Sequence, residues 1–301
     1  MKRLVVLGGG ESGVGTAILG KKKGYQVFVS DKGEIQAKYK EVLEHFEIEW
    51  ESEKHSEDKI LNADVVMKSP GIPDNVPLVQ KLVDIGVPVI SEMEFGQRFS
   101  KATVIGITGS NGKTTTTMLA HHLLKNGGLD VGVAGNIGDS YAKMVSEQDR
   151  ALYTLEISSF QLDGIQDFKP HITILTNITP DHLDRYNYQF EKYIASKFRI
   201  TMNQTRADYF IYDADDPVIQ EALKKYPVQS KLVPFSIKEV LETGAWLEDN
   251  TIKLNVEHKT LEMSTDILAL DGQHNVKNAM AASLAALLVN VRKETIRQSI
   301  Q

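Results

Sequence analysis

The 301-residue sequence contains no cysteine. This absence excludes disulfide bonds, thiolate metal sites and catalysis by a thiol. Any metal ion that this chain binds must therefore use oxygen or imidazole ligands. A chain without cysteine also suits a reducing compartment, and we expect a cytoplasmic protein.

An excess of positive charge is also missing. The chain has 34 Lys and Arg against 40 Asp and Glu, and residues of both signs are interspersed to give a net charge of −6. Nucleic-acid-binding proteins show a basic stripe instead. We therefore expect no nucleic acid as a partner.

Long hydrophobic runs are missing too. The longest apolar stretch, Ala279 to Val289, is alanine-rich and shorter than the roughly 18 residues of a membrane span. Near the start, Lys2 and Arg3 precede a run of strand length and not the hydrophobic region of a signal peptide. We expect a soluble, unprocessed monomer with no membrane partner.

What remains is a composition typical of globular proteins, 42% hydrophobic and 25% charged, at a length that suggests about two domains. Strand-like and helix-like segments alternate, which predicts an α/β fold with a doubly wound parallel sheet. In the first part we expect strands at residues 4–7, 26–30, 63–67 and 87–90, and helices at 37–46 and 76–85. The first sheet's sequence ends around residues 99–102, where we place a domain boundary.

The second part continues this alternation. We expect a strand from Thr103 and strands at 151–155, 172–177, 209–212 and 232–235, with helices from Lys113 and at 188–202, 217–225, 278–289 and 293–301. Three short segments, residues 245–248, 252–256 and 260–263, predict a small antiparallel appendage with a turn at Asp249-Asn250.

The segment Thr103 to Thr117, TVIGITGSNGKTTTT, reads as an apolar strand, a loop of small residues and the start of a helix. Small residues let successive backbone N–H groups turn inward, and the positive end of the helix then meets an anion. We expect Lys113 at the β and γ phosphates of ATP and the Thr114 hydroxyl on Mg²⁺. The general motif has glycine where this chain has Ile107, so the match is to a variant, GSNGKT. The alternative is a plain glycine turn with a solvated Lys113.

A second glycine-rich turn follows the first expected strand. Gly8, Gly10 and Gly13 have the G-x-G-x-x-G spacing, and Asp31 stands just after the next strand. On its own this pattern predicts a dinucleotide site. A glycine-rich turn without a ligand is the alternative, because a lone fingerprint is a weak signal.

Other candidates for metal binding follow later strands. Glu156, at the end of the strand 151–155, is placed to hold Mg²⁺ beside the phosphate loop. His182 lies in a loop dense in polar residues, but histidine is not a favoured Mg²⁺ ligand, so a role in loop packing explains it equally well. The position of Lys197 in the sequence does not by itself indicate a functional role.

Two further segments have both a functional and a plain explanation. Ser69-Pro70-Gly71 lies at the carboxyl end of a strand, where open α/β sheets bind ligands, and is equally well explained as a turn. Asn275 precedes the alanine-rich helix, where a helix N-cap is a serious competitor to a binding role.

Together these residues resemble the Mur ligase family, the ATP-dependent amino-acid ligases of peptidoglycan precursor synthesis. The family motifs occur in order: GSNGKT at 109–114, GNIG at 135–138, DHLDRY at 181–186 and GQHN at 272–275. EISSFQL from Glu156 and SPGI at 69–72 are similar to the branch whose substrates are UDP-N-acetylmuramoyl-L-alanine and D-glutamate. The resemblance spans essentially the whole chain.

The resemblance implies a fold of three domains. These are an N-terminal Rossmann-like parallel sheet for the uridine nucleotide, a central P-loop ATPase α/β domain, and a C-terminal domain that closes over ATP and the amino acid. This chain is similar to the first two, at residues 1–99 and 100–301. Because the third domain supplies nucleotide contacts and most of the D-glutamate pocket, we expect this chain to be inactive alone.

The resemblance also implies roles for single residues. The glycine turn would bind the diphosphate of UDP rather than a nicotinamide dinucleotide. Lys197 would be carbamylated and would help hold a second Mg²⁺ ion, or Mn²⁺, with Glu156 and His182. The expected ATP contacts are Gly109, Ser110, Asn111, Gly112, Lys113, Thr114, Thr115 and, at the adenine, Asn275. The expected substrate contacts are Gly10, Glu11, Ser12, Asp31, Lys32, Ser69, Pro70, Gly71, Asn136, Gln161 and His182.

In the implied reaction the substrate carboxylate attacks the γ phosphate, which gives ADP and an acyl phosphate, and the amine of D-glutamate then displaces phosphate. The expected catalytic residues are Lys113, Glu156, His182 and Lys197, and the expected metal ligands are Thr114, Glu156, His182 and Lys197. They would act through positioning and charge neutralisation. The alternatives are another Mur-type ligase, a NAD-dependent oxidoreductase, which leaves the second phosphate loop unexplained, and a non-catalytic ATP-binding scaffold.

Overall fold

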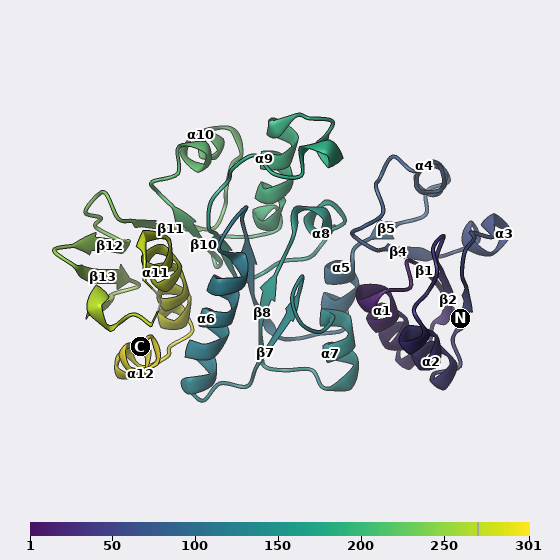
Figure 1. The fold of residues 1–301 in the computed structure, drawn as a ribbon, viewed down its shortest axis with the longest axis horizontal. Coiled ribbons are helices and arrows are strands. Elements are labelled where there is room, and N and C mark those ends of the chain that lie inside the picture. Colours follow the sequence, from purple (N-terminus) through teal and green to yellow (C-terminus); the bar gives the residue numbers. More distant parts are fainter. Residues whose placement is uncertain (270) are drawn as a thin grey trace. The chain divides into compact units, whose positions relative to one another are not determined.

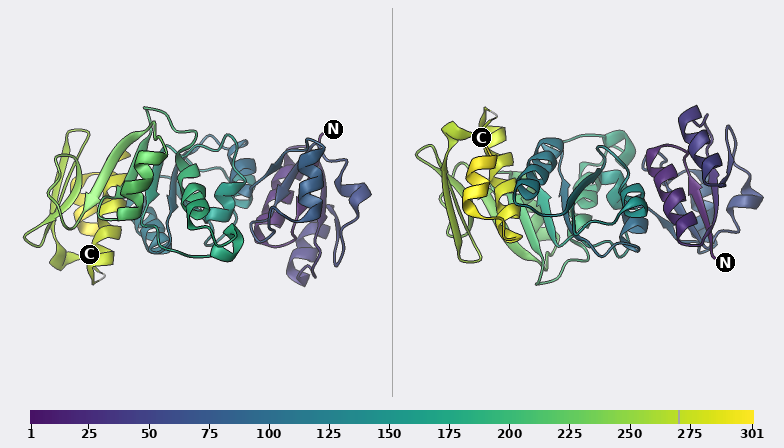
Figure 2. Two further views of the ribbon diagram at one scale, coloured as in Figure 1. Left: turned by 90° about the horizontal axis from the view of Figure 1, so that it is seen from above. Right: turned by 90° about the horizontal axis from the view of Figure 1, so that it is seen from below.

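The computed structural model describes residues 1–269 and 271–301, which divide into two compact units. The first unit contains residues 1–101, 134–149 and 160–168, and the second unit contains residues 102–133, 150–159 and 169–301. Figures 1 and 2 show the course of the chain through each of these units. Within the described residues, no helix combines the length and the apolar character that a membrane crossing requires.

The first unit is built on a five-stranded parallel sheet with the order β3-β2-β1-β4-β5. Its strands are β1 (Arg3–Leu7), β2 (Gln26–Ser30), β3 (Glu49–Glu51), β4 (Val65–Lys68) and β5 (Val89–Ile90). Chain order reverses between β1 and β4, so the crevice that binds ligands in open α/β sheets lies at this edge. The expected Rossmann-like parallel sheet is confirmed.

Helices cover both faces of this sheet because successive strand residues point to opposite sides. Val5 and Leu7 of β1 belong to a buried cluster that also contains Leu82 of α4 (Pro77–Asp84). On the other face, the side chain of Leu4 packs close to Gly20 of α1 (Glu11–Lys22). The remaining helices of this unit are α2 (Ala37–His45), α3 (Glu57–Ile60), α5 (Glu92–Gln97) and α7 (Tyr141–Glu147).

Two buried carboxylates tie later segments of the chain to the first unit. Glu92 Oε1 accepts hydrogen bonds from the Ser140 hydroxyl at 2.6 Å and from the backbone of Ala142 at 3.1 Å. Glu94 Oε2 accepts three backbone N–H groups, from residues 166, 167 and 168, at 2.8–2.9 Å. The first unit is therefore not continuous in sequence.

The second sheet has nine strands in the order β14-β13-β12-β11-β10-β9-β6-β8-β7. They are β6 (Thr103–Thr108), β7 (Val131–Gly135), β8 (Leu152–Glu156), β9 (Ile172–Leu175), β10 (Tyr209–Asp213), β11 (Lys231–Ser236), β12 (Gly244–Glu248), β13 (Thr251–Val256) and β14 (Lys259–Ser264). β12 pairs parallel to β11, whereas β13 and β14 are antiparallel to their neighbours. The expected antiparallel segments are confirmed, and they continue the edge of this sheet.

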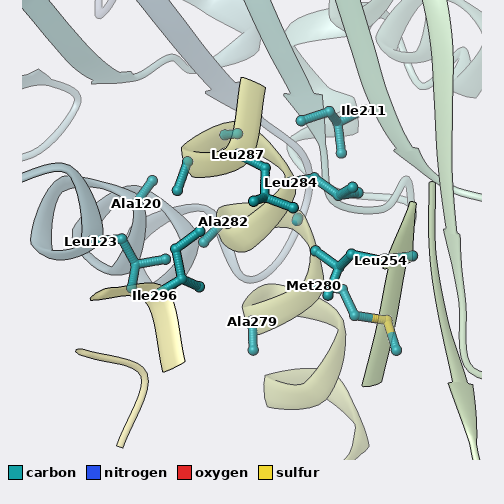
Figure 3. Close-up of a cluster of buried hydrophobic side chains, with 14 of the residues drawn as sticks. Ala120, Leu123, Ile211, Leu254, Ala279, Met280, Ala282, Leu284, Leu287 and Ile296 are labelled. Carbon is teal, nitrogen blue, oxygen red and sulfur yellow. The ribbon is translucent and has the colours of Figure 1, made fainter. Parts of the chain in front are cut away.

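The core of the second unit forms around the alanine-rich helix α11 (Gln273–Leu288). Ala282 and Leu284 lie in one buried cluster with Leu123 of α6 (Lys113–Asn126) and Leu254 of β13, as Figure 3 shows. Small alanine side chains allow α6 and the sheet to approach the helix closely. The other α-helices of this part of the chain are α8 (Ser159–Asp163), α9 (Phe190–Phe198), α10 (Pro217–Lys225) and α12 (Lys293–Ser299). All but the first residue of α8 belong to the first unit. The 3₁₀ turns are η1 (Leu183–Tyr186), η2 (Arg199–Thr201) and η3 (Thr265–Ile267).

Several expected boundaries were wrong. The helix expected from residue 278 begins at Gln273, and the helix expected over 188–202 is α9 followed by the 3₁₀ turn η2. The strand expected over 87–90 is only Val89–Ile90. Strand β7, which reads VGVAG, was not expected, because two glycines interrupt its short apolar pattern.

The glycine turn after β1 brings α1 unusually close to the backbone. A Cβ atom added at Gly13 would lie 1.8 Å from the carbonyl oxygen of Gly8, and only a shift of the helix or of the turn would relieve this contact. The third glycine of the fingerprint is thus required for close helix–strand packing.

We expect Gly13→Ala to destabilise the fold by roughly 1–3 kcal/mol, the usual cost of overpacking. Gly71→Ala is the matched control, because a Cβ there meets nothing within 4 Å. Urea unfolding of both variants measures the difference. Equal midpoints for Gly13→Ala and the wild-type protein would contradict this packing argument.

Candidate active site

The loop between β6 and α6 has the backbone geometry of a phosphate-binding loop. Gly112, the residue before the helix, has φ +80°, and Gly109 has φ +150°, conformations that L side chains rarely adopt. A Cβ at Gly109 would lie 1.9 Å from Thr176 Oγ1. Both glycines are therefore needed to present the free N–H groups at the start of α6 to an anion.

The segment after β9 holds this loop in place. Thr176 Oγ1 and Asn177 Nδ2 donate to the carbonyl of Asn111 at 2.6 and 2.9 Å. The backbone N–H of Asn111 donates to Asn177 Oδ1 at 2.9 Å, and the Ser110 hydroxyl donates to the carbonyl of Thr179 at 2.9 Å. Four of the expected ATP contacts, Gly109 to Gly112, thus form one fixed loop.

Lys113 is folded over the loop that precedes it. Its Nζ donates to the carbonyl oxygens of Gly109 and Ser110, each at 2.9 Å. Burial lowers the pKa of Lys113, and the carboxylates of Glu156 and Asp181 only partly oppose this effect. A phosphate group at the loop would supply the counter-charge for this partly buried cation.

Thr114 and Glu156 lie together at the start of α6. Thr114 Oγ1 donates to Glu156 Oε2 at 2.7 Å, and Glu156 is 2% exposed. A hydroxyl and a carboxylate are hard oxygen donors of the kind that Mg²⁺ prefers, and the phosphate loop beside them would add phosphate oxygens. This donor set fits Mg²⁺.

The described residues contain no group of three His, Asp or Glu side chains arranged to hold a metal ion. The expected metal ligands include only two residues of these types, Glu156 and His182, so phosphate oxygens and water would have to complete the coordination. His182 is 57% exposed, has φ +51°, and places Nε2 3.5 Å from Asp181 Oδ2.

Lys197 lies against the phosphate loop, although its position in the sequence gave no sign of this. Its side chain is 1% exposed, its Nζ donates to the carbonyl of Gly109 at 2.9 Å, and it lies 4.6 Å from the ring centre of Tyr193. The Tyr193 hydroxyl is 3.1 Å from Ser110 Oγ. Lys197 is thus a buried residue of the loop's surroundings and not a solvated surface residue.

A cavity of about 180 Å³ lies beside the start of α6. Thr115, Asn275 and Asn278 are among its lining residues, together with Leu119 and Ala279. Asn278, which the sequence did not single out, accepts from Thr116 Oγ1 at 3.1 Å and donates to Asn275 Oδ1 at 3.2 Å. The hydrogen bond from Thr116 links Asn278, and with it this cavity, to the helix that follows the phosphate loop.

The alternative interpretation of Asn275 as a helix N-cap was wrong. The N-cap of α11 is Gly272, with φ +99°, and Asn275 lies in the first turn of the helix. Its Nδ2 donates to the carbonyl of Asp271 at 2.8 Å, and Asn275 is one of the residues that line the cavity.

In the first unit, Asp31 holds the glycine turn. Its Oδ2 accepts the backbone N–H of Gly9 at 2.6 Å, and its Oδ1 accepts that of Gly33 at 2.8 Å. Gly10 is the N-cap of α1, and Glu11 at the start of this helix accepts from the Tyr39 hydroxyl at 3.2 Å. The residues expected near the uridine therefore surround the amino end of α1.

A larger cavity, of about 540 Å³, lies at the carboxyl edge of the first sheet. Asp31, Lys32 and Gly71 line it, and the side chains of Ile72 and Val76 give it apolar walls. Ser69 stands at the entrance to the turn after β4, where its backbone N–H donates to the carbonyl of Leu7 at 2.9 Å. Pro70 follows it in the turn.

The remaining expected substrate residues also belong to the first unit. Ser12 lies in the first turn of α1, Asn136 is exposed after β7, and Gln161 of α8 is 2% exposed.

Known proteins are similar to this chain over most of its length. Residues 107–286 match the Mur ligase middle domain, and residues 3–76 match the MurD N-terminal domain. The UDP-N-acetylmuramoylalanine--D-glutamate ligase of Christiangramia forsetii is 62% identical over 299 residues, which cover 99% of this chain and 67% of that protein. The protein of the same name from Bacteroides thetaiotaomicron is 49% identical over 300 residues, which cover 100% of this chain and 67% of that protein.

Solved structures share the fold. The UDP-N-acetylmuramate:L-alanyl-gamma-D-glutamyl-meso-diaminopimelate ligase from Neisseria meningitides superposes with a TM-score of 0.67 at 19% identity, covering 100% of this chain and 97% of that one. The middle-domain match alone spans more than half of the sequence, and the relatives agree with it over nearly the whole chain. The chain therefore belongs to the Mur ligase family.

Proposed function

We propose that this chain carries the substrate-binding and ATP-binding parts of a ligase that adds D-glutamate to UDP-N-acetylmuramoyl-L-alanine in peptidoglycan precursor synthesis. The observation that carries the proposal is a phosphate loop that hydrogen bonds hold in place, with the Glu156 carboxylate bonded to the Thr114 hydroxyl beside it. Relatives named for this reaction are 62% and 49% identical to this chain. We assign the activity to a cytoplasmic monomer.

We further propose a division of labour between two domains. Residues 1–99 bind the uridine nucleotide, with the glycine turn at the diphosphate and the cavity beside Asp31 and Lys32 at the nucleoside. Residues 100–301 bind ATP, with the base in the cavity lined by Thr115 and Asn275. Asn136, Gln161 and His182 contact the muramoyl-alanine part of the substrate.

In the proposed reaction the alanine carboxylate attacks the γ phosphorus of ATP and the bond to the ADP oxygen breaks, which leaves an acyl phosphate. The amine of D-glutamate then attacks the acyl carbon, phosphate leaves, and the amine loses a proton as the amide forms. Lys113 and the N–H groups of the loop bind the phosphate charge in a fixed geometry. Bound Mg²⁺ ions, held by Thr114, Glu156, His182 and a carbamylated Lys197, would neutralise charge between carboxylate and triphosphate. No enzyme nucleophile is needed.

The rival proposal of a nicotinamide-dependent oxidoreductase rests on Gly8, Gly10, Gly13 and Asp31. In that class the acidic residue binds the ribose hydroxyls. Here both oxygens of Asp31 already accept backbone N–H groups of the neighbouring turns. This arrangement gives the carboxylate a structural role in the turn, and the oxidoreductase leaves the second phosphate loop, before α6, unexplained.

We expect Lys113→Ala to weaken Mg-ATP binding by roughly tenfold to a hundredfold or more, because charge-assisted hydrogen bonds to phosphate are lost. Lys125→Ala, on the exposed far end of the same helix, is the control and should bind ATP normally. Isothermal titration calorimetry measures both affinities. An unchanged affinity in Lys113→Ala would refute the phosphate-loop assignment.

UDP should raise the melting temperature of this chain, and NAD should not. A ligand present at 100 times its dissociation constant stabilises a fold by about 2.7 kcal/mol, which differential scanning fluorimetry resolves. ATP titrated separately tests the second site. Protection by NAD in preference to UDP would support the oxidoreductase, and protection by ATP alone would support a nucleotide-binding scaffold.

The proposed role of Lys197 requires a change in the sign of its charge. An ordinary lysine has a pKa of about 10.4 and is a cation, which metal ions would repel. Carbamylation joins the neutral amine nitrogen to the carbon of CO₂ with loss of one proton, and the product is an anion. Lys197 is buried against the phosphate loop, and this position supports a role for the anion beside metal ions bound with ATP.

We expect a carbamate carbon signal in ¹³C NMR spectra of the chain in ¹³C-bicarbonate with MgATP at alkaline pH, where more of the amine is neutral. The signal should be absent from Lys197→Ala. Lys192→Ala, on the exposed side of the same helix, should keep it. A spectrum of the wild-type chain without the signal under these conditions would return Lys197 to a purely structural role.

A further inference from the structure

Three polar side chains form a relay at the carboxyl edge of the first sheet. Ser30 ends β2 and is completely buried, and Glu51 ends the neighbouring strand β3 in register with it. Ser30 Oγ lies 2.7 Å from Glu51 Oε1 and also 2.7 Å from Nδ1 of His55. The carbonyl of Lys54 is a more distant neighbour of the same hydroxyl, at 3.4 Å.

The carboxylate of Glu51 is an acceptor only. Burial raises the pKa of Glu51, but hydrogen bonds from the side chain and backbone of Ser56 and from Ser30 outweigh burial, and the net pKa lies below its ordinary value. Ser56 donates to Oε2 at 2.6 Å through its hydroxyl and to Oε1 at 2.7 Å through its backbone. Glu51 is thus ionised at neutral pH and has no proton to give to Ser30.

A count of protons then fixes the tautomer of His55. The Ser30 hydroxyl has one proton, and a contact of 2.7 Å with an ionised oxygen requires that proton to point at Glu51. If Ser30 donated to His55 instead, a lone pair of Ser30 Oγ would face a lone pair of Glu51 Oε1 across 2.7 Å. His55 must therefore carry its own proton on Nδ1 and donate it to Ser30.

The other ring nitrogen of His55 is consequently free of a proton. Burial lowers the pKa of His55, while the carboxylates of Glu51 and Asp31 raise it and Lys32 lowers it, and the net direction is downward. The imidazole is therefore neutral at neutral pH, and Nε2 holds a lone pair. A neutral histidine in this tautomer is a hydrogen-bond acceptor at Nε2.

This acceptor belongs to the 540 Å³ cavity. His55 is one of its lining residues, and the polar Asp31 and Lys32 and the apolar Ile72, Pro73 and Val76 are others. Since Nδ1 is committed to the buried Ser30, Nε2 is the ring nitrogen left for a ligand. The apolar residues offer a surface for a flat ring. His55 adds a neutral acceptor to the carboxylates of Asp31, Glu53 and Glu57, which also belong to the lining.

We propose that His55 is a specificity-determining residue that accepts the imide N3–H of a uracil ring through Nε2. The proposal rests on the function proposed above and assigns the base end of that substrate. Uracil has a donor at N3, whereas cytosine has an acceptor there. The tautomer that Ser30 and Glu51 impose therefore favours uracil over cytosine, because an acceptor held in place disfavours a ligand that lacks the matching donor.

The first measurement is the tautomer itself, read from ¹H–¹⁵N two-bond correlations of the histidine rings in the ligand-free chain. We expect a protonated Nδ1 and an unprotonated Nε2 for His55, assigned by loss of the signals in His55→Phe. This readout does not depend on any substrate. A protonated Nε2 in the neutral ring would overturn the proposal whatever the chain binds.

The second measurement is the affinity for UDP, CDP and N3-methyl-UDP by calorimetry. We expect the wild-type chain to bind UDP more tightly than either analogue by on the order of tenfold to a hundredfold, the cost of one unmatched hydrogen bond in a desolvated site. His55→Phe keeps a flat ring without the acceptor, and its preference should fall to near unity. His45→Phe, on the exposed face of α2, is the control and should keep the preference.

The outcomes separate the two proposals. UDP binding with an unchanged preference in a folded His55→Phe would overturn the role of His55 and leave the uridine function standing. A wild-type chain that binds none of the three nucleotides would overturn both. Ser30→Ala provides a further check, because it removes the tautomer lock and keeps the ring. Its preference should shrink, and a preference equal to that of the wild-type chain would contradict the relay.

Discussion

The second unit depends on keeping the amino end of α6 open to an anion. Free N–H groups at a helix start are attractive to phosphate only when the chain before them turns away. Gly109 and Gly112, both at positive φ, make that turn, and Thr176 and Asn177 hold the carbonyl of Asn111 in place. These hydrogen bonds are made within the chain, so an anion that binds there need not supply the full cost of ordering the loop.

The helix α11 links this loop to the rest of the sheet. Its Lys277 lies 2.8 Å from Asp213 and 3.0 Å from Asp215, both nearly buried at the end of β10. Asn278 follows Lys277 in this helix, and its Oδ1 would lie 2.8 Å from a Cβ atom added at Gly112. The ion pairs thus fix the first turn of α11 against the sheet, and the alanines that follow let the helix lie close to α6. The same helix thus lines the 180 Å³ cavity and lies close to the phosphate loop at Gly112.

A feature of the fold or of the site was predictable from the sequence where the residues that form it lie close together along the chain. The phosphate loop was predictable because strand, glycines, Lys113 and helix follow one another in fifteen residues of sequence, and the parallel first sheet was predictable from its alternation. Asn278 was missed because its partner Thr116 is 162 positions away. Asn275 was given a wrong alternative because an asparagine before apolar residues resembles an N-cap, whereas Gly272 adopts that position. Such long-range pairings leave no periodic signal.

The direction of hydrogen bonds is a further property that residue types alone do not give, because a serine hydroxyl can donate or accept. In the second unit, Ser110 donates to the carbonyl of Thr179 and accepts its backbone N–H, so the Tyr193 hydroxyl beside it must be the donor of their 3.1 Å contact. In the first unit, the ionised Glu51 accepts the hydrogen bond that the Ser30 hydroxyl donates. In both places a buried serine whose single proton is committed decides the role of its neighbour. Whether Tyr193 or His55 donates a hydrogen bond to its serine is therefore decided by the serine's other partner, and not by the type of the residue itself.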